Sequence, residues 1–124
     1  MNSTEIQSSL TAIADADNDS DNDRRRHTRY TVQVPIEIHP EGSAVPVRLE
    51  TTDLSRGGCY IQALTPLRVG IRVQAMLWLA DHPIVVRGRV VTRHPQFGNG
   101  IMFEDFEDQS ESLLNRYLEA IIAD

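Results

Sequence analysis

The sequence predicts a mainly β domain of the β+α class: a small antiparallel barrel of about six strands followed by one C-terminal α-helix. Two observations predict this fold. Between residues 30 and 103, short stretches alternate apolar and polar residues, with turn residues between them roughly every 8–12 positions. After residue 107 the apolar residues change to helical spacing, which indicates a terminal helix.

The first two strands are expected to form a hairpin. Alternation from Tyr30 to His39 predicts a strand with one buried face, and Pro35 within it indicates an edge position or a bulge. Residues 40–43 have the composition of a turn, and alternation resumes over residues 45–51. The chain therefore returns to the point where the first strand began.

Further strands are predicted over residues 59–61, 73–79 and 84–94 and around residues 101–103, with turns at 66–70, 81–83 and 96–100. Cys59 is expected to be a small core residue. On the long strand, alternation places Arg87, Arg89, Val91 and Arg93 on the outer face. These arginines either extend a ligand surface or form a solvated face, and surface composition favours the second interpretation.

The C-terminal segment is predicted to be an amphipathic helix. Asp108 and Glu111 have capping-box spacing. One apolar stripe follows, made of Leu113, Leu114, Tyr117, Leu118, Ile121 and Ile122. The stripe packs either on the barrel or on a partner, and the open end of a small barrel favours the barrel.

Length and composition indicate one cytoplasmic domain. The 124 residues include a single cysteine, which excludes an intrachain disulfide and suits a reducing compartment. The N-terminus lacks the layout of a signal peptide, and no apolar run approaches the roughly 18 residues that span a bilayer. We therefore expect no membrane insertion.

The charge is divided unevenly along the chain. The net charge is −6, but residues 1–23 contain six acids and no base, and the remainder contains equal numbers of acids and arginines. Alternating aspartates cannot bury enough surface to fold, so a flexible acidic tail is predicted over residues 1–23. The barrel with its N-terminal arginine loop is expected over 24–107, and the helix over 108–124.

Two short motifs carry the functional chemistry. Arg24, Arg25, Arg26 and Arg29 place four guanidiniums at the entrance to the first strand. Arginine binds phosphate, or the O6/N7 edge of guanine, two hydrogen bonds at a time. The segment from Asp53 to Gly58 adds a carboxylate that can accept from a guanine N–H edge, the Ser55 hydroxyl and a glycine turn.

The hairpin brings these motifs together, since Arg29 starts its outgoing strand and Asp53 ends its returning strand. A formally neutral domain with one arginine cluster favours a compact anionic ligand over a long polyanion, so no nucleic acid is expected as a partner. No metal site is expected, because the histidines at 27, 39, 82 and 94 have no metal-ligand spacing.

Arg25-x-x-x-Arg29 followed by Asp53-x-Ser55-x-x-Gly58 resembles the RxxxR and (D/N)xSxxG signature of PilZ domains, bacterial receptors for cyclic di-GMP. The resemblance covers about residues 24 to 107 and implies a six-stranded antiparallel PilZ-type β-barrel. It implies that Arg25 and Arg29 bind phosphates and the Hoogsteen edge of guanine, that Asp53 and Ser55 bind its N–H edge, and that Gly58 permits the turn.

The resemblance adds three further implications. Arg24 is associated with an intercalated dimer of cyclic di-GMP, whereas Arg26 either joins the site or points to solvent. Some family members stack an aromatic residue on the base from the strand that carries Val91, and this sequence has none there.

The predicted function is that of a non-enzymatic cyclic di-GMP receptor without a cofactor. In it, ligand orders the Arg24–Arg29 loop against the Asp53–Gly58 turn and exposes a surface for a downstream protein partner. Two alternatives from other classes stay open: a PilZ-like protein–protein adaptor that does not bind nucleotide, and a small nucleic-acid-binding barrel. The sequence shows no nucleophile–base pair, which argues against an enzyme.

Overall fold

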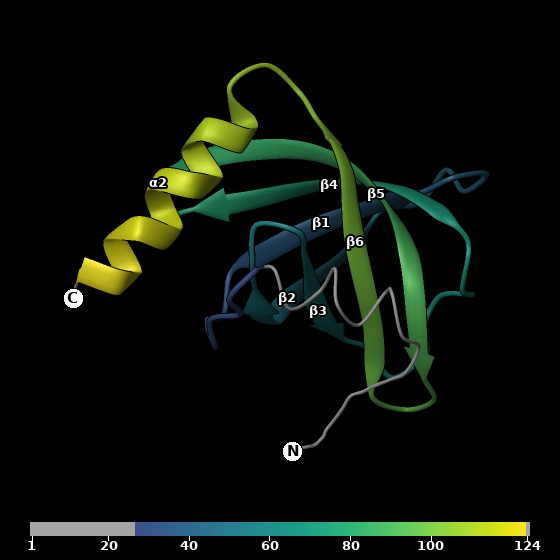
Figure 1. Ribbon diagram of the computed structural model, residues 1–124. Helices are drawn as coiled ribbons and strands as arrows, with labels where there is room; N and C mark the ends of the chain where they lie inside the picture. The colour runs from purple at the N-terminus through teal and green to yellow at the C-terminus, as the bar shows by residue number, and fades with distance from the viewer. Residues whose placement is uncertain (1–26, 124) are drawn as a thin grey trace.

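The computed structural model describes residues 27–123, with side chains to residue 121. It contains a closed barrel of six antiparallel strands in the order β1-β2-β3-β6-β5-β4, followed by one helix, α2 (Figure 1). The elements are β1 (Pro35–Pro40), β2 (Val47–Leu54), β3 (Gly58–Gln62), β4 (Arg72–Leu79), β5 (His82–His94), β6 (Gly98–Phe106) and α2 (Ser110–Ala123). The predicted fold class, a six-stranded antiparallel barrel with a C-terminal helix, is confirmed, and the tail predicted over residues 1–23 lies outside the described residues.

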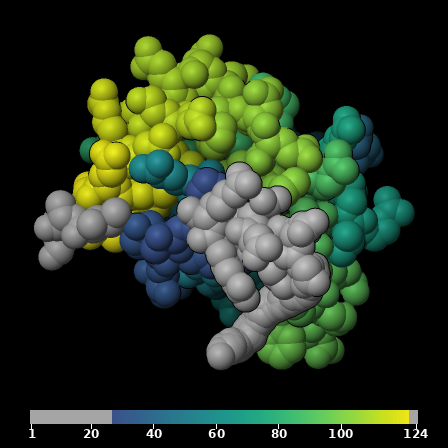
Figure 2. Space-filling model, viewed as in Figure 1, coloured from purple at the N-terminus to yellow at the C-terminus, as the bar shows by residue number. Residues whose placement is uncertain are grey.

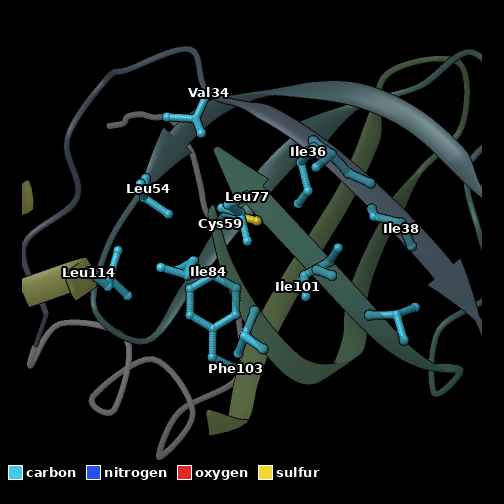
Figure 3. Close-up of a cluster of buried hydrophobic side chains, with 14 of the residues drawn as sticks. Val34, Ile36, Ile38, Leu54, Cys59, Leu77, Ile84, Ile101, Phe103 and Leu114 are labelled. Carbon is cyan, nitrogen blue, oxygen red and sulfur yellow. The ribbon is translucent and has the colours of Figure 1, made fainter. Parts of the chain in front are cut away.

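Alternation along the strands fills the barrel interior with aliphatic side chains from every strand (Figure 3). On β5 the inward residues are Ile84, Val86, Gly88 and Val90, as the sequence predicts. Cys59 is buried in this core, and burial raises the pKa of its thiol. A buried neutral thiol is a packing residue, which confirms that expectation.

The first strand starts five residues later than predicted, because a side chain replaces part of its backbone pairing. The Thr51 hydroxyl accepts a hydrogen bond from the Val34 amide at 3.0 Å and donates to the Val32 carbonyl oxygen at 2.8 Å. Regular pairing with β2 begins only at Pro35. Pro35 thus lies at the first position of a strand, where a missing N–H is tolerated.

The turn predicted at 96–100 is present but shorter and shifted: the chain turns at residues 95–97, and β6 already begins at Gly98. The chain reverses just before it, where Gln96 has a φ of 68°. A side chain at Gly98 would overlap the carbonyl oxygen of Ile61 on β3. Gly98 is therefore a close-approach residue inside a strand, an arrangement that glycine-rich composition alone does not distinguish from a turn.

The turn predicted at 81–83 is also shifted. The reversal lies at Ala80 and Asp81, and Ala80 has a φ of 56°. His82 and Pro83 already pair with β4. Pro83 lies near the start of β5, as expected for a residue without an amide donor.

The C-terminal helix packs on the barrel, as favoured by its apolar stripe. Leu114 and Leu118 are buried, and Leu113, Tyr117 and Ile121 pack partly against the same core. In the space-filling view the yellow C-terminal helix lies against the body of the barrel (Figure 2). No helix in the described part of the chain is both long and apolar enough to cross a membrane.

The predicted capping box is wrong. The helix begins at Ser110, and Asp108 has a φ of 49°, which is not the extended conformation of an N-cap residue. The buried Ser110 hydroxyl instead accepts a hydrogen bond from the Val85 amide of β5 at 2.9 Å. This bond fixes the start of the helix on the barrel.

Candidate ligand-binding site

The described end of the arginine segment, residues 27–29, lies against the turn between β2 and β3 that carries the second motif. Tyr30 and Leu54 exchange two backbone hydrogen bonds of 2.9 Å each. The His27 ring packs on Gly57 in the same turn, since a Cβ added to Gly57 would lie 2.7 Å from Cδ2 of this ring. Residues 27–30, which include Arg29, therefore lie along the turn that carries the second motif.

Asp53 is half-buried on the outer face near the end of β2. A bulge between Thr51 and Asp53 shifts the register, so that Thr51 points into the core and Asp53 lies opposite Tyr60. Burial raises the pKa of the Asp53 carboxyl group, while the positive charge of Arg29 and the Tyr60 amide oppose the rise. The carboxylate is thus poorly hydrated and electrostatically coupled to Arg29.

Ser55 is 7% exposed, and its hydroxyl holds the turn together. It accepts from the Gly57 amide at 3.1 Å and donates to the Gly58 carbonyl oxygen at 3.3 Å. The Ser55 amide donates to the same carbonyl oxygen at 2.8 Å. A hydroxyl has one hydrogen to donate and two lone pairs, and within the described residues only one of the two lone pairs of Ser55 accepts a hydrogen bond.

Gly58 permits close packing and does not supply an unusual turn conformation. Among the described glycines, only Gly42 and Gly70 have positive φ. Gly58 pairs with Met102 on β6, and a Cβ there would overlap the carbonyl oxygen of Ile101. The expectation that this glycine serves the turn itself is therefore corrected: it lets the turn lie close to β6.

The other predicted site residues are placed as follows. Arg29 is exposed beside the turn. Arg24, Arg25 and Arg26 lie outside the described residues, so their positions remain predictions from the motif.

Comparison with known proteins assigns the family. The family model described as "PilZ domain" matches residues 23–120. The chain belongs to the PilZ domain family. This match confirms the resemblance inferred from the two motifs, and no curated protein matches the chain.

Two solved structures show the same fold. The PilZ domain of CeSA from a cellulose synthesizing bacterium is 21% identical with a TM-score of 0.60, and the match covers 76% of this chain and 97% of that domain. The Bacillus subtilis inhibitor of motility (MotI/DgrA) is 15% identical with a TM-score of 0.64, over 81% of this chain. The PilZ chain spans 52% of the MotI/DgrA structure, about half of its length.

The outer arginines of β5 in this PilZ domain are largely engaged with acids. Arg87 binds Asp105 at 2.6 Å, and Arg89 lies 3.4 Å from Glu104. Charges neutralised by neighbours on β6 are less available to an anion. These contacts favour the solvated-face interpretation of Arg87 and Arg89 over an extension of the ligand surface.

Sequence reasoning missed one pair of residues near the site. The Tyr60 hydroxyl lies 2.8 Å from Nδ1 of His94, with ring centroids 5.8 Å apart. The two residues are 34 positions apart and are separated by β6 in the sheet. No spacing in the sequence indicates such a contact.

Proposed function

We propose that this PilZ domain is a non-enzymatic receptor for cyclic di-GMP. The observation that carries the proposal is the pairing of Tyr30 with Leu54, because the residue before each of them, Arg29 and Asp53, then lies at the same turn. Guanine offers acceptors at O6 and N7 on one edge and N–H donors on the other. A guanidinium and a carboxylate in one site are complementary to these two edges.

The proposed roles follow the motif residues. Arg25 and Arg29 bind the phosphates and the Hoogsteen edge of guanine, and Arg24 contributes to holding an intercalated dimer. Asp53 accepts from the guanine N–H edge, with the remaining lone pair of Ser55 as a second acceptor. Gly58 brings the turn close to β6, and Arg26 is a further candidate for phosphate contact.

Ligand binding is proposed to act as a switch in the arginine segment. The four guanidiniums repel one another, and the two negative phosphates of each cyclic di-GMP offset part of this repulsion, which favours an ordered loop against the turn. Because His27 and Tyr30 already contact the turn, the change is expected at Arg24–Arg26 and in the Arg29 side chain. The reordered surface would then bind a downstream protein partner.

Base selectivity tests the proposal. Adenine lacks the N1–H and exocyclic N2–H donors that Asp53 would bind, so cyclic di-AMP should bind at least tenfold more weakly than cyclic di-GMP. The two affinities are compared by equilibrium dialysis at one salt concentration. Equal affinity for the two dinucleotides would show that the site reads phosphate alone and would contradict the assigned role of Asp53.

Affinity should fall as the pH falls through the raised pKa of Asp53. The ligand is expected to bind the carboxylate, and burial moves protonation of this group above its usual pKa of 3.8. Asp53→Asn is the matched control, since an amide oxygen still accepts from guanine but does not titrate. Calorimetry between pH 4 and pH 7 should show a pH-dependent affinity for the wild type and a flat profile for Asp53→Asn. A flat wild-type profile would contradict the prediction.

The two alternatives predict other results. A protein adaptor without nucleotide binding would bind neither dinucleotide. A nucleic-acid-binding barrel would bind RNA with a steep salt dependence and would not bind the dinucleotide with comparable affinity. Its aromatic content of 6% is low for a surface that stacks successive bases.

A further inference from the structure

Tyr60 lies next to the proposed site without a part in either motif. It is half-buried on β3, directly opposite Asp53 on β2 and Gly100 on β6. Side chains directly opposite on antiparallel strands share one face of the sheet, with Cβ atoms about 4.5–5.5 Å apart. Tyr60 and Asp53 thus share the outer face, and Gly100 leaves the position on the other side of Tyr60 without a side chain.

The Tyr60 ring leans across β6 toward β5. A Cβ at Gly98 would come within 2.9 Å of Cε2 of Tyr60, so the ring lies over this glycine. Gly98 pairs with His94 on β5, and the Tyr60 hydroxyl reaches Nδ1 of His94 at 2.8 Å. The ring is supported by the backbone of β6 and held at its hydroxyl by β5.

We propose that Tyr60, held in place by His94, is the platform on which a guanine base of the ligand stacks, with the N–H edge of the base directed toward Asp53. This inference rests on the proposed function and names the aromatic contact of the same site. The platform comes from β3, whereas β5 offers only the aliphatic Val91, which is 37% exposed.

Two physical properties suit Tyr60 to this role. A phenol is neutral near pH 7 and does not repel the phosphates of the ligand, and burial and the nearby Asp53 raise its pKa further, to about 12. The hydrogen bond to His94 fixes the ring before the ligand arrives, so less side-chain freedom is lost on binding. A fixed neutral ring is a better stacking surface than a mobile one.

The test is the affinity of Tyr60 variants for cyclic di-GMP by calorimetry. Tyr60→Ala should weaken binding by about 5- to 150-fold, the range that base–aromatic stacking contributes on alanine substitution. Tyr60→Phe keeps the ring and should remain much closer to wild type. Phe97→Ala is the matched control, because Phe97 is an aromatic residue that is 68% exposed, lies in the β5–β6 loop and belongs to neither motif.

A second measurement separates stacking from a structural role. A base over an aromatic ring shows an upfield NMR shift of the guanine H8 proton, expected with wild type and Tyr60→Phe and reduced with Tyr60→Ala. Because the stacked guanines of an intercalated dimer also shift H8 upfield, the comparison between Tyr60→Ala and Tyr60→Phe carries the test. If Tyr60→Ala does not fold, Tyr60→Leu takes its place, since leucine fills much of the space without an aromatic ring. Two results would overturn the platform alone: an H8 proton that does not shift when the ligand binds the wild type, or an affinity of Tyr60→Ala within twofold of the wild-type affinity. A wild type that does not bind would overturn the proposed function and the platform together.

Discussion

Replacing Arg29 by alanine should weaken binding of cyclic di-GMP at least tenfold while leaving the fold intact. A hydrogen bond to a charged group contributes about 1.5–3 kcal/mol, and Arg29 is the described arginine whose charge reaches Asp53. Its side chain is exposed, so the free energy of unfolding should change by less than about 0.5 kcal/mol. Calorimetric titration and thermal unfolding of the same sample measure the two effects.

Arg29→Lys and Arg93→Ala are the controls. Lysine keeps the charge but lacks the planar fork that binds phosphate or guanine bidentately, so it should restore only part of the affinity. Arg93 is an exposed arginine on β5, and its loss should leave affinity within twofold. Wild-type affinity in both Arg29→Ala and Arg25→Ala would contradict the assignment of the arginine segment to the ligand.

Gly58→Ala should destabilise the domain and also remove binding. A Cβ at this position would overlap the carbonyl oxygen of Ile101, a backbone atom that moves only if β3 and β6 separate. Forced overpacking of this kind costs about 1–3 kcal/mol. For a domain of this size, each kcal/mol lowers the melting temperature by about 4–8 °C, which thermal unfolding detects directly.

The adjacent Gly57→Ala is a matched comparison. Its Cβ would meet the ring of His27, a side chain that can rotate away. Gly57→Ala should therefore leave the melting temperature close to wild type, with the His27 ring rotated off the turn, and weaken binding less than Gly58→Ala. Equal melting temperatures for the two variants would show that Gly58 is not required for the approach of β3 to β6.

Most of the fold could be predicted because each strand buries one face, and the alternation of apolar and polar residues along the strand shows which face is buried. The errors in strand boundaries occur where a single contact with a neighbouring strand replaces the regular pattern. Before Pro35, the Thr51 hydroxyl forms the hydrogen bonds that a neighbouring strand's backbone would otherwise form. Gly98 lies inside a strand, although the glycine-rich sequence around it predicts a turn. Both depend on a neighbouring strand in space, which local sequence does not show.

The candidate site could be predicted in part. The spacing of the two motifs on a hairpin correctly places Arg29 near Asp53, because Tyr30 pairs with Leu54. The bonds of Ser55 within the turn and the packing role of Gly58 were not predicted. The contact of Tyr60 with His94 requires the register of three strands, β3, β6 and β5, and long-range register is what a single sequence specifies least.

Calorimetric titration of the full chain with cyclic di-GMP tests the central claim most directly, because it gives stoichiometry together with affinity. We expect saturable binding with two nucleotides per chain, consistent with an intercalated dimer held with the help of Arg24. One nucleotide per chain would retain the receptor and remove the dimer. No binding by calorimetry and by a second method would contradict the receptor function and favour the protein adaptor.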